Sequence, residues 1–228
     1  ILKAYKKAYE CDSESIFGGI VAANREIDAD TAKEMSAIFL EVIVAPSYSD
    51  EALKILLEKK NLRVLELPSI SEFSSERDYE IKKVCGGILV QDADREIFRK
   101  DDLKTVTITN VSKEVEDDLV FAMKVVKHVK SNAIVLVRNQ QTVGIGPGQP
   151  NRITSTRIAI ENAGEKAKGS VLASDAFFPF ADCVQAAASA GIAAIIQPGG
   201  SLRDKESIDE CNKHEIPMVF TGMRHFKH

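Results

Sequence analysis

Short apolar stretches alternate with amphipathic stretches along the chain, and this alternation most constrains the fold. Runs such as EVIVAP (41–46) and IAAIIQ (192–197) are almost wholly apolar for the length of a strand. They predict strands buried on both faces, as in a sheet covered by helices. The stretch 112–131 between such runs has acids early and lysines late, as the helix macrodipole favours. The sequence therefore predicts the α/β class.

The same criteria predict the order of the elements. Helices are expected at 2–10, 28–39, 47–61, 112–131, 152–167, 182–191 and 204–215. Strands are expected at 18–24, 41–46, 62–67, 86–91, 105–110, 170–174, 192–197 and 218–222, with two more in 132–146 that meet at Asn139-Gln140. Residues 68–80 are polar and predict a surface connection. A second half is expected to begin near Val111, which gives domains 1–110 and 111–228.

The charge balance and the cysteines exclude several classes of protein. The 30 Lys+Arg and 34 Asp+Glu give a net charge of -4, which offers no electrostatic case for nucleic acid or an anionic membrane. No apolar run approaches the roughly 18 residues of a membrane span, and a cytoplasmic protein is expected. The cysteines lack C-x-x-C spacing, so neither a zinc site nor a disulfide framework is predicted. They are expected to be small buried apolar residues: Cys11, Cys85, Cys183 and Cys211.

Two glycine-rich turns follow predicted strands. VGIGPGQPNR places Gly144, Gly146 and Gly148 before a helix that starts near Arg152. Free N–H groups at a helix start suit an anion, so one interpretation is a phosphate site with Arg152 as its charged clamp. The other interpretation is a tight strand-to-helix turn, and the glycines alone do not decide between them. QPGGS (197–201) repeats the arrangement at a strand end, where α/β proteins often bind ligands.

The stretch SDAFFPFAD (174–182) crowds three aromatic rings around a proline. Phe177, Phe178 and Phe180 lie between Asp175 and Asp182. A proline does not fit a central strand, so the rings are predicted to form a pocket wall. Packing of the rings in the core is the alternative.

Polar residues at other element ends are further candidates. His128 is either an acid/base group or a cation that complements the end of its helix. Asn132 enters an otherwise apolar strand, where its amide needs a partner, such as a ligand. Arg224 follows the last strand and is expected at the edge of the sheet. His225 and His228 lack a third ligand at suitable spacing, so no metal is predicted.

Seven motifs, in this order, resemble one family across essentially the whole chain. They are SIFGG, EVIVAP, KSNAIV, GIGPGQPNR, SDAFFPF, QPGGS and TGMRHFKH. Together they resemble the aminoimidazole carboxamide ribonucleotide (AICAR) transformylase part of a bifunctional purine-biosynthesis enzyme whose other half is inosine monophosphate (IMP) cyclohydrolase. The resemblance implies two cytidine-deaminase-like α/β layers in tandem, the first incomplete at its N-terminus. It implies no zinc, because the deaminase H-x-E or C-x-E and P-C-x-x-C motifs are missing.

The resemblance also implies an activity and its participants. The reaction is formyl transfer from the cosubstrate 10-formyltetrahydrofolate to AICAR in IMP biosynthesis, at sites between the subunits of a homodimer. By match to the family motifs, the residues expected to contact AICAR are Phe17, Gly18, Glu41, Asn132, Arg152, Phe177, Arg224 and His228. Those expected on the folate side are Ile153, Phe180, Asp182, Ser201 and Leu202. Asn132 is expected to support catalysis.

One departure from the family affects the expected activity. The family's catalytic Lys-His pair belongs to a K-H-x-N-P-C-G-like segment that this chain does not contain, and Lys127-His128 is not that pair. The chain is therefore expected to carry binding surface but to be inactive alone, without the cyclohydrolase domain. The alternative function is a non-catalytic nucleotide- or folate-binding module.

Overall fold

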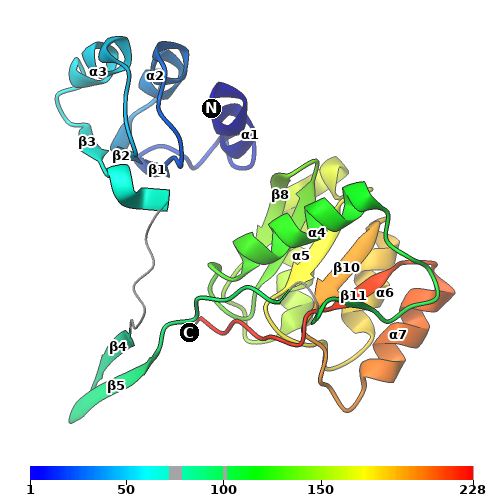
Figure 1. Ribbon diagram of the computed structural model, residues 1–228. Helices are drawn as coiled ribbons and strands as arrows, with labels where there is room; N and C mark the ends of the chain where they lie inside the picture. Colours follow the sequence, from blue (N-terminus) through cyan, green and yellow to red (C-terminus); the bar gives the residue numbers. More distant parts are fainter. Residues whose placement is uncertain (72–78, 100–101, 228) are drawn as a thin grey trace. The chain divides into compact units, whose positions relative to one another are not determined.

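A computed structural model describes residues 1–71, 79–99 and 102–227 (Figure 1). These residues form two compact units, Ile1–Ala93 and Asp94–His228. The division falls before the predicted boundary at residue 110, and strand β6 (Lys104–Thr105) belongs to the second unit, where it pairs with strand β11 (Met218–Phe220). The mixture of helices and sheets confirms the α/β class.

The first unit contains a small parallel sheet with helices. Its strands are β1 (Gly19–Ala22), β2 (Leu40–Ala45) and β3 (Arg63–Glu66), in the order β1-β2-β3. Its helices are α1 (Leu2–Tyr9), α2 (Ala29–Ser36) and α3 (Asp50–Leu57), followed by the 3₁₀ turn η1 (Pro68–Ser71). Asp28 caps the start of α2, because its side chain accepts the N–H of Thr31. The core of this unit includes Ile27, Ile43 and Leu56, all fully buried.

The described residues of the first unit end in an antiparallel hairpin. Strand β5 (Gly87–Asp92) matches a predicted strand, and it pairs with β4 (Tyr79–Val84), which the sequence did not predict. YEIKKV has three charged residues and lacks an apolar alternation, and all six residues of β4 are exposed.

The second unit is built on a six-stranded sheet in the order β6-β11-β10-β9-β7-β8. Its remaining strands are β7 (Ile134–Arg138), β8 (Gln141–Gly146), β9 (Val171–Ser174), β10 (Ala194–Gln197) and β11 (Met218–Phe220). Its helices are α4 (Lys113–Val126), α5 (Arg152–Ala163), η3 (Gly164–Ala167), α6 (Asp182–Ser189) and α7 (Asp204–Lys213). The sequence predicted each of these elements. One prediction was too long, because the strand expected at 105–110 pairs only at its start, in β6.

Two hydrophobic cores lie on opposite faces of this sheet, because side chains alternate along each strand. Ile134 and Leu136 face the core formed with α5, α6 and α7. Val135 and Val137 face the core formed with α4, the green helix that crosses the sheet in Figure 1. The sheet is therefore buried on both faces, as its apolar strands predicted.

Helix α5 packs directly on β8 through two glycines. A Cβ at Gly146 would overlap the backbone oxygen of Ser155, and one at Gly144 would overlap that of Ala159. These two glycines therefore serve the close approach of helix and strand, which favours the strand-to-helix turn over a phosphate cradle.

The four cysteines all lie in the described residues and form no disulfide, and their reactivity is expected to differ widely. Burial raises the pKa of the Cys183 and Cys211 thiols to about 12, whereas Cys85 is exposed. At pH 8 these two buried thiols should react with a thiol reagent on the order of a thousandfold more slowly than an exposed thiol of ordinary pKa. Native and denatured labelling followed by peptide mass spectrometry measures this. Rapid native labelling of Cys183 would contradict the described packing.

Two features are absent from the described residues. In residues 1–71, 79–99 and 102–227, no helix combines the length and apolarity needed to cross a membrane. Within the same ranges, His, Cys, Asp and Glu side chains form no group of three or more placed to hold a metal ion.

Candidate functional site

The register of the second unit's sheet brings several candidate segments to one edge. Strands β9, β10 and β11 are parallel, so the loops that begin at 175, 198 and 221 leave the same edge. Strand β7 starts at this edge because Ile134 pairs with Ser174, and β8 ends there because Gly146 pairs with Ile134. Loop ends at the carboxyl edge of parallel strands are where α/β proteins commonly bind ligands.

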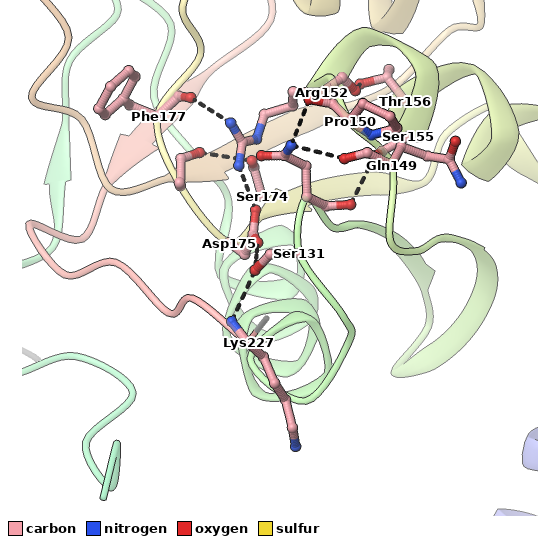
Figure 2. Close-up of polar contacts among 12 residues, drawn as sticks. Ser131, Gln149, Pro150, Arg152, Ser155, Thr156, Ser174, Asp175, Phe177 and Lys227 are labelled. Carbon is pink, nitrogen blue, oxygen red and sulfur yellow. Dashed lines mark hydrogen bonds and ion pairs between the residues drawn. The ribbon is translucent and has the colours of Figure 1, made fainter. Parts of the chain in front are cut away.

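A buried ion pair lies at the centre of this edge (Figure 2). Arg152, the first residue of α5, donates from Nη2 to Asp175 Oδ1 at 2.7 Å. Its Nη1 donates to the backbone oxygen of Phe177 at 3.1 Å. The side chain of Arg152 is 8% exposed and that of Asp175 is fully buried. Burial makes such a pair depend on good geometry, and two of the guanidinium nitrogens have it here.

The opposite oxygen of Asp175 joins the pair to the C-terminal segment. Asp175 Oδ2 accepts from Ser131 Oγ at 2.6 Å, and Ser131 Oγ accepts from the backbone N–H of Lys227 at 2.9 Å. The N–H of His225 donates to the backbone oxygen of Asp175 at 2.9 Å. The carboxylate therefore connects segments that precede β7, follow β8, follow β9 and follow β11.

Asn132 lies beside this group. Its Nδ2 donates to the backbone oxygens of Gln149 at 2.9 Å and Pro150 at 3.3 Å. Its own backbone oxygen accepts from Ser155 Oγ at 2.8 Å. The side chain thus holds the loop that leads into α5, and its Oδ1 is the remaining polar atom.

A model of the AICARFT/IMPCHase bienzyme family matches residues 1–162 of the chain. The chain belongs to this family. Curated relatives extend the similarity across the whole chain, residues 163–228 included.

Members of the family from several bacteria are highly similar to the chain. Bifunctional purine biosynthesis protein PurH from Acetivibrio thermocellus is 62% identical over 228 residues, and the PurH proteins of Ruminiclostridium cellulolyticum and Petrotoga mobilis are 60% and 58% identical. Each match covers 100% of this chain and 44% of the relative, so the chain spans less than half the length of these relatives. A solved structure, Acinetobacter baumannii RibD form 2, aligns at 15% identity over 47% of this chain and 34% of its own, with a TM-score of 0.33 that is too low to bear on the fold.

The candidates that the family resemblance places in the first unit lie at the amino end of its parallel strands. Phe17 is 74% exposed, and its ring contacts that of Phe39 in a tilted arrangement with centroids 5.2 Å apart. The N–H of Gly18 donates to the backbone oxygen of Phe39 at 2.8 Å. Glu41, near the start of β2, lies 3.7 Å from Arg63 in an exposed ion pair. These residues form a local group within their own unit.

A hollow of about 310 Å³ adjoins this group. Its lining comes from the end of α2, the start of β2 and the segment after α3, and includes Phe39 and Leu62. None of the predicted site residues lines it.

The folate-side candidates lie along the edge of the second unit without forming one contact network. Phe180 is 49% exposed, and the guanidinium carbon of Arg203 lies 4.9 Å from its ring centroid. Leu202 is fully exposed, Ile153 is partly buried, and Asp182 begins α6 with its Oδ1 accepting the N–H of Cys183.

The second glycine turn already holds an anion of its own. Asp204 Oδ2 accepts the N–H groups of Gly200 at 2.7 Å and Ser201 at 3.2 Å. A carboxylate of the chain thus occupies the donors that the QPGGS motif offered to a phosphate. Ser201 remains a folate-side candidate, but its backbone N–H is engaged.

The three rings of the aromatic stretch have different environments, so the prediction that they share a pocket wall holds for two of them at most. Phe178 is fully buried in the core under α5 and α6, where it packs with residues such as Leu172. Phe177 is partly buried, and Figure 2 shows its ring pointing away from Arg152.

The C-terminal candidates fall into three groups. His225 is 1% exposed, with Nδ1 2.7 Å from Asp94 Oδ2 and Nε2 2.7 Å from the oxygen of Ile97, so it anchors the segment. Arg224, next to it, is exposed and lies over the Phe226 ring at 5.6 Å. His228 lies outside the described residues.

Sequence reasoning missed the residues that organise this edge. Ser131 was not singled out, Asp175 was noted only as a flank of the rings, and His225 was considered only as a metal ligand. A signal existed: Ser174-Asp175 is a polar pair directly after a strand that is otherwise apolar. Buried polar groups in such a place require partners.

The surroundings of His128 disfavour its predicted role as a cation at the end of the helix. It follows α4, and burial, with the nearby charges of Lys227 and Lys127, lowers its pKa. A neutral imidazole does not complement the helix dipole. The buried Lys127 stands at that helix end instead, donating from Nζ to the oxygen of Glu96 at 2.8 Å.

Proposed function

We propose that this chain supplies AICAR- and folate-binding surface to an AICAR transformylase. The proposal rests on membership of the AICARFT/IMPCHase family and on one arrangement: an oriented, buried guanidinium, Arg152, at the sheet edge where the other candidates of the second unit lie. The whole protein would transfer the formyl group of 10-formyltetrahydrofolate to AICAR.

The proposed reaction makes one carbon–nitrogen bond and breaks another. The 5-amino nitrogen of AICAR attacks the formyl carbon and gives a tetrahedral intermediate. Collapse of the intermediate breaks the bond from that carbon to N10 of the folate, and the proton lost by the amine ends on N10. Formyl-AICAR and tetrahydrofolate result, with no net oxidation or reduction.

Residues of this chain suit binding and orientation in that reaction. Because Asn132 Nδ2 is held by two carbonyls, its Oδ1 can accept a hydrogen bond from the reacting amine or the carboxamide of AICAR. An amide oxygen is a poor base, so Asn132 would orient the substrate while another group takes the proton. Arg152 would donate to the nucleotide, and Arg224 offers an exposed charge for its phosphate.

The proposal also covers the fold of each unit, the cellular location and the oligomeric state. We infer that each unit is a cytidine-deaminase-like layer. Four cysteines without a disulfide favour a cytoplasmic location. Sites shared between two subunits would make the enzyme a homodimer, and light scattering of the chain tests this.

Loss of Arg152 is expected to weaken AICAR binding markedly. A ligand at one hundred times its Kd stabilises the native state by about 2.7 kcal/mol, which thermal unfolding detects. Arg152→Ala should remove most of this AICAR-induced stabilisation, since a buried charge-assisted donor is lost. Arg157→Ala is the matched control, because Arg157 is exposed on the same helix, and it should keep the full stabilisation.

The outcomes separate the candidate functions. If neither AICAR nor 10-formyltetrahydrofolate stabilises the unaltered chain, the motifs serve packing alone and the proposal fails. If both bind, but a full-length relative with the change equivalent to Arg152→Ala keeps its formyl transfer, the chain is a binding module without a part in catalysis.

A further inference from the structure

We propose that Asp175 is a positioning residue: its two carboxylate oxygens fix Arg152 and Ser131, and so hold the Arg152 guanidinium and the segment carrying Arg224 in one frame for an anionic nucleotide. This inference rests on the proposed function and adds to it a residue that contacts no substrate. The family resemblance assigned no role to Asp175 or Ser131.

The first step concerns the carboxylate itself. Asp175 is fully buried, and each of its oxygens receives a short hydrogen bond, from Arg152 Nη2 at 2.7 Å and from Ser131 Oγ at 2.6 Å. A buried carboxylate is tolerated when such partners are present. Because the two partners come from the start of α5 and from the segment before β7, the carboxylate sets their distance from each other (Figure 2).

The second step concerns the free donor on Arg152. Nη1 and Nη2 donate to Phe177 and Asp175, whereas the buried Nε has no hydrogen-bond partner among the described residues. A buried N–H without an acceptor is unfavourable, and an oxygen-rich ligand would satisfy it. Since Asp175 already neutralises the guanidinium, Arg152 would act as an oriented donor and not as a source of excess charge.

The third step concerns the C-terminal segment. Ser131 exchanges two hydrogen bonds with Lys227, as its N–H donates to the Lys227 oxygen at 2.9 Å and its Oγ accepts the Lys227 N–H at 2.9 Å. His225 donates its N–H to the oxygen of Asp175. Arg224 is therefore next to His225, which is hydrogen-bonded to the backbone of Asp175, while Arg152 is hydrogen-bonded to the Asp175 side chain.

The test measures the Kd for AICAR of the chain and its variants by calorimetry, alongside unfolding without ligand. Asp175→Asn keeps the shape but loses the charge, and should raise the Kd about tenfold, the change expected for one charge-assisted hydrogen bond. Ser131→Ala should raise it about threefold, since it loosens only the C-terminal segment. Ser170→Ala, which removes another buried hydroxyl bonded to the oxygen of Ala167, should leave the Kd unchanged.

A double-mutant cycle separates positioning from general stability. In an Arg152→Ala background, Asp175→Asn should add little to the loss of affinity, because the carboxylate acts mainly through that arginine. Fully additive losses, or equal Kd values for the wild type and Asp175→Asn, would overturn the positioning role while the proposed function stands. If Asp175→Asn does not fold, an unchanged Kd in Ser131→Ala overturns it. Failure of the unaltered chain to bind AICAR overturns the proposed function first, and this inference with it.

Discussion

Replacing Gly146 by alanine is expected to lower the free energy of unfolding of the second unit by about 3 kcal/mol or more. The added Cβ would overlap the backbone oxygen of Ser155, and a helix backbone cannot yield as a side-chain tip does. Helix α5 must then move away from β8 or the strand must bend. Because Arg152 is the first residue of α5, the same change should weaken AICAR binding. Urea unfolding, with and without the ligand, measures both effects.

Gly148 in the same motif is the matched control. It has a φ of 65°, and the nearest atoms to an added Cβ belong to the flexible Lys130 side chain, at 3.7 Å or more. Gly148→Ala should therefore cost only about 1 kcal/mol, the penalty for a left-handed backbone. A Gly146→Ala variant as stable as the wild type would show that α5 does not pack on β8 as described.

The elements of the fold could be predicted largely because each depends on local pattern. The hairpin of β7 and β8 turns at Asn139 and Gln140 as expected, and both have a φ of 53°. What stabilises this turn was not predictable: Asp118 on α4 accepts the N–H groups of both residues, at 2.7 and 2.6 Å. Contacts between distant segments depend on the sheet order, which local periodicity does not encode.

The strand predicted at 105–110 is longer than the one observed, again because contacts between distant segments decide the outcome. Its residues have high strand propensity, yet only β6 forms a ladder with β11. Beyond it, the Thr107 side chain accepts the N–H of Met218, and the N–H of Ile108 donates to Asn212 on α7. Side chains thus replace the backbone ladder at this edge, an outcome that depends on partners more than 100 residues away.

The candidate site was predictable in its motifs but not in its connections. The glycine turn, the aromatic stretch and the C-terminal arginine all reach the sheet edge of the second unit. Ser131 and Asp175, which connect them, are 44 residues apart, and the two motifs that contain them do not indicate that they pair. Their pairing follows from the register that sets Ile134 opposite Ser174, so it becomes visible only in the folded sheet.

Phe178→Ala is expected to lower the free energy of unfolding by about 3–5 kcal/mol, as for other large-to-small changes in a packed core. The Phe178 ring is fully buried and belongs to the core under α5 and α6. Phe180→Ala should change stability by no more than about 0.5 kcal/mol, since that ring is 49% exposed and contacts a surface arginine. Urea unfolding of the two variants gives the comparison.

These variants also divide the aromatic stretch between stability and binding. If Phe180 belongs to the folate side, Phe180→Ala should reduce stabilisation by 10-formyltetrahydrofolate while leaving unfolding without ligand nearly unchanged. Phe178→Ala should do the reverse: a less stable protein whose folded fraction still binds. Pro179 then has a physical purpose, because a fixed φ between the two rings helps to send one into the core and the other toward solvent. Equal losses of stability from both variants would mean that the stretch is packing throughout.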